Sequence, residues 1–208
     1  FKIAMRDLEI RGAGNILGAE QHGHVAAVGF DLYCRMLEDA VKEARGEELP
    51  VEKTVSIDIQ VKAYIPQEYI PDTGVKIDFY QRINGIKEVK EIDQLAEELK
   101  DRFGEMPEPL VNLLRIAAIK ISAVQARVHS ITQEKDLIKI KMEDDHGLTG
   151  NQLMNLARRY RRQVSFSAAQ GLEIVVNILN LEKKQMLLFL EEIILEISSL
   201  ARKEAALV

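Results

Sequence analysis

The chain has 208 residues, of which 47% are hydrophobic and 29% are charged, and its formal net charge is −5. That length and apolar content allow one or two domains with a real core, while the acidic balance argues against a large autonomous nucleic-acid-binding surface, which would usually be basic. The single cysteine excludes an internal disulfide and a multi-cysteine zinc site and suits a reducing cytoplasm, and no apolar run approaches the length of a membrane span.

The first 46 residues predict two helical arms joined by a glycine-punctuated loop. A short helix is expected over residues 1–10 and a clearer one over 30–44, where Cys34 lies on the apolar face and is expected to be structural. Four glycines punctuate the loop between them: Gly12, Gly14, Gly18 and Gly23. Glycines at this spacing suggest sharp reversals of the backbone, but glycine-rich polar loops are common. The residues alone therefore leave both a functional loop and an ordinary loop open.

A polar, acidic stretch with one proline over residues 47–53 is expected to link this segment to a second domain, residues 54–208. Strict alternation of apolar and polar residues over 54–64 predicts a half-buried strand. Helices are expected over 75–86, 88–103 and 110–126. Gly104 should end the second of them, and Pro107 and Pro109 should delay the third until Leu110.

The second half of the chain predicts the order strand, strand, helix twice. A β-hairpin is expected from 128–133 and 137–142, followed by a helix over 150–160 with Thr149 as its N-cap. Strands over 164–167 and 172–178 then precede a long amphipathic helix over 181–201. The sequence therefore predicts an α+β protein, with an N-terminal helical hairpin followed by a compact mixed domain of helices packed on short, mainly antiparallel strands.

Four arginines cluster at the end of the 150–160 helix: Arg158, Arg159, Arg161 and Arg162. Cations at this position complement the helix dipole, and a phosphate contact is the alternative interpretation. Catalytic motifs are absent from the sequence. It has neither the lysine-containing phosphate loop nor the acidic magnesium ligand of a nucleotide hydrolase, and its four histidines lack partners at metal-ligand spacing. We therefore expect no ATP hydrolysis, no metal and no cofactor in this chain alone.

Residues 6–24, RDLEIRGAGNILGAEQHGH, resemble a translocation motif that the bacterial transcription-repair coupling factor family shares with RecG helicases. The matching positions are Asp7, Arg11, Gly12, Gly14, Gly18, Gln21 and Gly23. In those families the motif is a helical hairpin that couples ATP hydrolysis to movement along double-stranded DNA. The resemblance implies that Arg11 and Gln21 act in translocation, through contacts with the motor or the DNA backbone.

Two later stretches, AYIPQEYIPD at 63–72 and ELKDRFGEMPEP at 98–109, resemble the C-terminal domain of the coupling factor family, whereas RecG ends soon after the hairpin. The chain starts at Phe1 without a methionine, and we expect it to be part of a longer protein. The resemblance implies a parent that is an ATP- and Mg²⁺-dependent translocase on double-stranded DNA, removes stalled RNA polymerase and recruits nucleotide excision repair in the cytoplasm. A stand-alone interaction module without a motor is the alternative.

The resemblance also implies that residues 54–208 pack against a UvrB-like module of the parent and so mask its UvrA-binding surface. Candidate contacts are Glu98 and Asp101, because residues three apart share one face of a helix and can be exposed while Leu95 and Leu99 are buried. A solvated acidic face is an equally good interpretation of these two residues.

Overall fold

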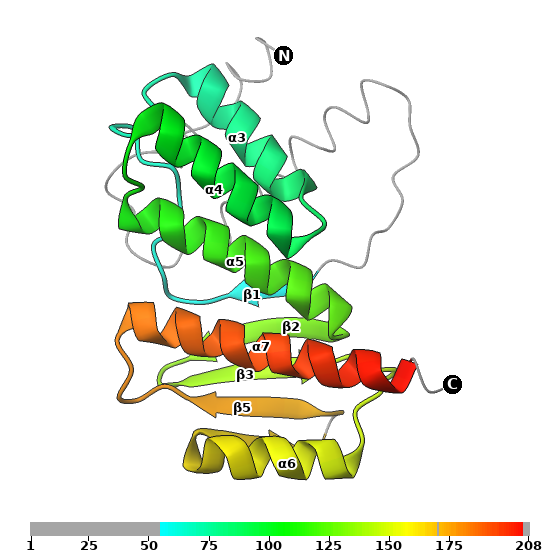
Figure 1. Cartoon of the computed structure of the whole chain (residues 1–208). Helices are drawn as coiled ribbons and strands as arrows, with labels where there is room; N and C mark the ends of the chain where they lie inside the picture. Colours follow the sequence, from blue (N-terminus) through cyan, green and yellow to red (C-terminus); the bar gives the residue numbers. More distant parts are fainter. Residues whose placement is uncertain (1–54, 170, 206–208) are drawn as a thin grey trace, which may run out of the picture.

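The computed structural model describes residues 55–169 and 171–205, and these form helices and one mixed sheet, which confirms the predicted α+β class (Figure 1). The expected hairpin over 1–46 and the linker over 47–53 lie outside the described residues. In chain order the elements are β1 (Ser56–Asp58), α3 (Thr73–Gly85), α4 (Val89–Phe103), α5 (Glu108–Gln125), β2 (Val128–Glu134), β3 (Leu137–Met142), α6 (Gly150–Tyr160), the 3₁₀ turn η2 (Arg161–Gln163), β4 (Val164–Ser167), β5 (Glu173–Asn177) and α7 (Lys183–Ala205).

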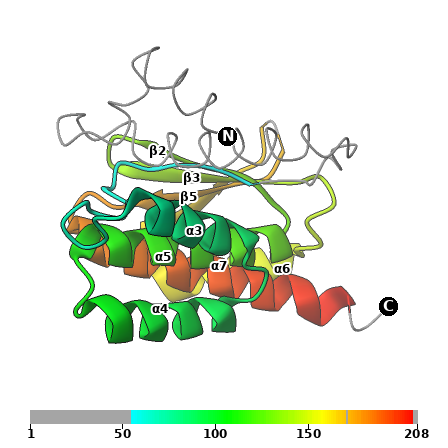
Figure 2. The ribbon, with the colours of Figure 1, turned by 90° about the horizontal axis from the view of Figure 1, so that it is seen from above.

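The sheet has the strand order β1-β2-β3-β5-β4, in which β1 runs parallel to β2 and every other neighbouring pair is antiparallel. Register places Ile131, Ile140 and Ile174 side by side, and none of the three is exposed. The described helices lie on one side of the sheet, with α5 and α7 next to each other and α4 farthest from the strands (Figure 2). The core therefore lies between this face of the sheet and the helices.

The extended segment over 55–65 differs from the single strand predicted there. Its side chains alternate between buried and more exposed as expected, and the buried ones are Val55, Ile59, Val61, Ala63 and Ile65. The hydrogen-bonded ladder nevertheless stops at Asp58, so the predicted strand is wrong in length. Beyond Asp58 the backbone turns to other partners, because backbone groups that leave a ladder inside a protein must be satisfied elsewhere.

Side chains from three different elements provide several of those partners, and the amide of Tyr64 donates to the carbonyl of Pro109 at 3.2 Å. The amide of Gln60 donates to Oε1 of Gln133 on β2 at 2.8 Å, and Nδ2 of Asn112 on α5 donates to the carbonyl of Lys62 at 3.1 Å. The amide of Ile65 donates to the hydroxyl of Tyr80 on α3 at 2.8 Å. The segment therefore joins the sheet to α3 and α5.

Local capping explains where the helices begin. Asp72 precedes α3, and its side chain accepts a hydrogen bond from the amide of Val75 at 2.8 Å. Glu88 and Glu91 form a reciprocal capping box at α4, which ends as expected at Gly104 with φ of +85°. The expected start of α5 at Leu110 is wrong, since the helix begins at Glu108. Proline fits the first helical turn because the amides there have no intrahelical partner.

The second half of the chain confirms the predicted order of strand, strand and helix, twice. Thr149 caps α6 through a reciprocal box with Gln152, as its position before the helix suggested. The last strand is slightly shorter than predicted, and the last helix begins at Lys183 and extends to Ala205.

Tyr80→Phe tests whether the extended segment depends on its side-chain partners. We expect the free energy of unfolding to fall by about 1–3 kcal/mol, because the buried amide of Ile65 loses its acceptor. Urea denaturation of the purified chain, followed by circular dichroism, measures the change. Tyr64→Phe is the matched control, since the side chain of Tyr64 is 41% exposed, and it should cost less than about 0.5 kcal/mol. Equal costs for the two variants would contradict the assignment.

Candidate functional site

The residues predicted to act in translocation lie outside the described residues. They are Asp7, Arg11, Gly12, Gly14, Gly18, Gln21 and Gly23. Their roles therefore stay predictions. The two candidate interdomain contacts, Glu98 and Asp101, both lie on α4 and are described.

Helix α4 is strongly amphipathic. Ile92, Leu95 and Leu99 are buried against the rest of the helical layer, as the spacing predicted, and Phe103 is half-buried. Asp101 lies on the exposed side of the helix, whereas Glu98 is partly exposed and faces Arg82 on α3. Because α4 packs on α5, the outward side chains stand on a rigid element.

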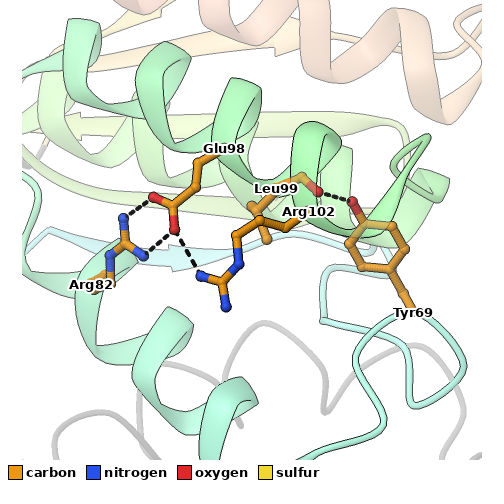
Figure 3. A network of polar contacts seen from close by, with 5 residues as sticks. All are labelled: Tyr69, Arg82, Glu98, Leu99 and Arg102. Atoms are coloured by element: carbon orange, nitrogen blue, oxygen red, sulfur yellow. Dashed lines mark hydrogen bonds and ion pairs between the residues drawn. The ribbon is translucent and has the colours of Figure 1, made fainter.

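Glu98 is held by two arginines (Figure 3). Its Oε1 accepts from Nη1 of Arg82 on α3 at 2.9 Å and from Nη1 of Arg102, one turn along α4, at 3.0 Å. Its Oε2 accepts from Nη2 of Arg82. The hydrogen bonds from Arg82 and then Arg102 lower the pKa of Glu98 from its usual 4.5 to about 2, so the carboxylate is ionised at neutral pH.

The two guanidinium groups lie on an aromatic base. The centre of the Arg82 guanidinium is 5.0 Å from the centroid of the Phe79 ring, and that of Arg102 is 5.3 Å from the same centroid. Arg102 also lies 5.1 Å from the ring of Phe103, which meets Phe79 edge to face. Cations over aromatic faces are attracted by the ring quadrupole. We call Arg82, Glu98 and Arg102 the arginine clamp.

Tyr69 fixes the end of α4 beside this clamp. Its hydroxyl lies 2.9 Å from the carbonyl oxygen of Leu99 (Figure 3) and 2.9 Å from that of Gly104, so its single proton serves one carbonyl at a time. Burial raises the pKa of the Tyr69 phenol, and Glu105 raises it further. The loop before α3 is thereby tied to the C-terminal end of α4.

The structure separates the two candidate carboxylates. The Glu98 side chain is 34% exposed and is paired with Arg82 and Arg102, so it is less open to solvent than Asp101. Asp101 is exposed, as expected. Glu98 therefore has a defined role inside the domain, whereas Asp101 projects into solvent on the same helix.

The basic cluster at the C-terminal end of α6 is partly engaged within the fold. Nη1 of Arg159 lies 3.2 Å from Oε1 of Glu196 on α7, and the guanidinium stacks on Tyr160 at 5.7 Å. The hydroxyl of Tyr160 donates to Glu196 at 2.6 Å, and burial raises the pKa of this phenol. Arg159 therefore joins α6 to α7.

The described part of the chain holds neither a candidate metal site nor a candidate membrane span. Between residues 55 and 205, with position 170 left out, no group of three or more His, Cys, Asp or Glu side chains could hold a metal ion. Over the same residues, no helix is both long enough and apolar enough to cross a membrane.

The arginine clamp was not predicted from the sequence, although one of its two ion pairs could have been. Glu98 and Arg102 are four residues apart on one predicted helix, a spacing that favours an ion pair. Arg82 is 16 residues before Glu98 on another helix, so its contact depends on how α3 crosses α4. What the arrangement offers chemically is a rigid charged surface for binding, with Asp101 as one of its exposed anions.

Comparisons with known proteins place the chain among relatives of one kind. Residues 59–153 match the family model of the TRCF domain. The chain is 40% identical over 181 residues to the transcription-repair-coupling factor of Bacillus subtilis strain 168. The aligned region covers 86% of this chain and 15% of that protein. It is 43% identical over 144 residues to the factor of Staphylococcus haemolyticus strain JCSC1435, covering 68% of this chain and 12% of that one.

A solved structure agrees with these relatives. The crystal structure of the C-terminal domain of a transcription-repair coupling factor superposes with a TM-score of 0.62 at 25% sequence identity. The match covers 72% of this chain and 98% of the solved chain. The resemblance seen in residues 63–72 and 98–109 is therefore confirmed.

Glu98→Gln tests the arginine clamp through pH. Because the pKa of Glu98 is lowered, its stabilising effect is present above pH 4.5 and is lost as pH falls towards 2. We expect the free energy of unfolding of the variant to be about 1 kcal/mol lower than that of the unsubstituted chain at pH 7. The figure is modest because solvent screens the ion pairs. Urea unfolding at several pH values should show this difference shrinking between about pH 4.5 and 2.

Asp101→Asn is the matched control for that experiment, since it neutralises an exposed carboxylate on the same helix. It should change the unfolding free energy by less than about 0.5 kcal/mol. A Glu98→Gln effect that stays constant across this pH range would contradict the clamp.

Proposed function

Because the chain belongs to the transcription-repair-coupling factor family, we propose that residues 54–208 form the domain that masks a UvrA-binding surface of the parent protein. The mask is a docking contact between the outward face of α4 and a UvrB-like module of the same protein. Asp101 and Glu98 are its acidic contacts, and the surface that they meet is basic. The domain regulates by binding and carries out no reaction itself.

The observation that carries this proposal is the exposed position of Asp101 on a helix whose other side is buried. A docking contact needs side chains held in place before binding, because ordering them on association lowers affinity. Helix α4 meets that need through its capping box, its packing on α5 and the Tyr69 contact to its last turn. Charges on such a surface set register and suppress wrong partners more than they add affinity.

The remaining activities belong to the longer relatives. The chain spans only 15% of the Bacillus subtilis factor that it matches. We propose that the parent protein works in the cytoplasm as an ATP- and Mg²⁺-dependent translocase on double-stranded DNA that displaces stalled RNA polymerase. In that protein, residues 1–46 couple ATP hydrolysis in the motor to movement, through Arg11 and Gln21.

Charge reversal of Asp101 tests the mask. In the full-length protein, Asp101→Lys should raise UvrA binding by roughly two- to fivefold, since one exposed ionic contact contributes up to about 1 kcal/mol and the new cation also repels a basic partner. Titration of labelled UvrA with the purified full-length protein measures the affinity.

Asp144→Lys is the matched control for this experiment. It makes the same charge change at an exposed position of the turn between β3 and α6, away from α4. It should leave UvrA affinity unchanged. Identical affinities for the Asp101 variant and the unmodified protein would refute the docking assignment.

Arg11→Ala tests the proposed coupling role. The full-length variant should retain most of its ATP hydrolysis, because Arg11 is not proposed to bind ATP, while displacement of a stalled polymerase should be lost. A steady-state ATPase assay and a polymerase-displacement assay on the same preparation separate the two activities. Lys42→Ala, which removes a cation outside the motif, should retain both. Normal displacement by the Arg11 variant would refute the role.

A further inference from the structure

We propose that the arginine clamp competes with the docking partner for Glu98, so that the pairing seen here is the undocked state of the mask and docking exchanges one set of ion pairs for another. This inference rests on the proposed docking function of α4. It adds that Arg82 and Arg102 weaken the mask, although they stabilise the helix pair that carries it.

The first support is the occupancy of the Glu98 carboxylate. Its two oxygens already accept three N–H groups from two guanidinium groups. A carboxylate has about four lone-pair sites, so little acceptor capacity remains for a cation brought by a partner. Two cations around one anion also leave this spot without a negative charge to attract a basic surface. A partner cation therefore gains Glu98 only when a guanidinium leaves it.

The second support is that both arginines make further contacts that do not involve Glu98. Arg102 lies over the rings of Phe79 and Phe103, and these contacts do not involve Glu98. Arg82 lies over Phe79 and is also attracted electrostatically by Asp78, one turn earlier on α3. Release of the carboxylate therefore leaves the aromatic base covered.

The third support is exposure. The side chains of Arg82 and Arg102 are 39% and 46% exposed, so these ion pairs stand in solvent, where they are weak and exchangeable. A deeply buried pair would be too costly to open. The clamp is thus placed to tune the mask, while Asp101 stays available throughout.

Arg102→Met in an Asp101→Asn background tests the competition in the full-length protein. By the proposed function, Asp101→Asn raises UvrA binding because the mask loses a contact. Adding Arg102→Met removes one of the two cations on Glu98, which opens its Oε1 to a partner cation, and keeps an apolar side chain over the aromatic rings. UvrA binding should therefore fall again by about two- to fivefold. Titration with labelled UvrA gives the affinities, and thermal unfolding shows that each variant is folded.

Two further variants in the same background separate competition from a general effect. Lys100→Met removes a cation from the same helix, but Lys100 pairs with Glu105 at 2.9 Å and not with Glu98, so UvrA affinity should not change. Arg102→Lys keeps the positive charge four residues after Glu98 and should behave like arginine.

The direction of change decides between the possible roles. If Arg102 only supported the fold, Arg102→Met would loosen the mask and raise UvrA binding further. That rise, or no change, overturns the competition while leaving the proposed function intact. If Asp101→Asn itself has no effect on UvrA binding, the proposed docking site fails, and the competition fails with it.

Discussion

The fold depends on how the extended segment over 59–65 satisfies its backbone after it leaves the sheet. Its side chains alternate into the core, which keeps the segment buried, so its amides and carbonyls have limited access to water. Gln133, Asn112 and Tyr80 supply the missing partners from β2, α5 and α3. These contacts fix α3 and α5 relative to the sheet. Helix α4, which packs on α5, takes its position from them.

Sequence periodicity predicted the elements well where a local signal marks both ends. Alternation gave the hairpin around Glu134, and Thr149 marked the start of α6. The start of α3 was predicted two residues late, at Val75 instead of Thr73, because the cap at Asp72 was not recognised. It did not predict where β1 stops, because a ladder strand and an extended segment under helices alternate in the same way. The start of α5 was also predicted too late, because Pro109 was expected to exclude helix. A proline breaks the interior of a helix but fits its first turn.

The site was harder to predict than the fold, because no local pattern in the sequence distinguishes Glu98 from Asp101. Both are acidic, both lie on the polar side of α4, and they stand three residues apart. Only the crossing of α3 over α4 brings Arg82 to one of them and not to the other. A carboxylate closed by two guanidinium groups and one open to solvent differ in how readily a partner reaches them. That difference is tertiary, and no local pattern reports it.

The clamp also bears on how a chain with a net charge of −5 selects a partner. An acidic protein attracts many basic surfaces through its long-range field, and salt screens that attraction. A contact made only of open carboxylates would share this lack of discrimination. In the proposed exchange, a partner must bring a cation to Glu98 and also tolerate the guanidinium of Arg102 that it displaces. A uniformly basic surface fails the second condition, because it repels the released arginine. Selectivity then follows from the placement of charges of both signs, in which unfavourable contacts exclude wrong partners as much as favourable ones hold the right one.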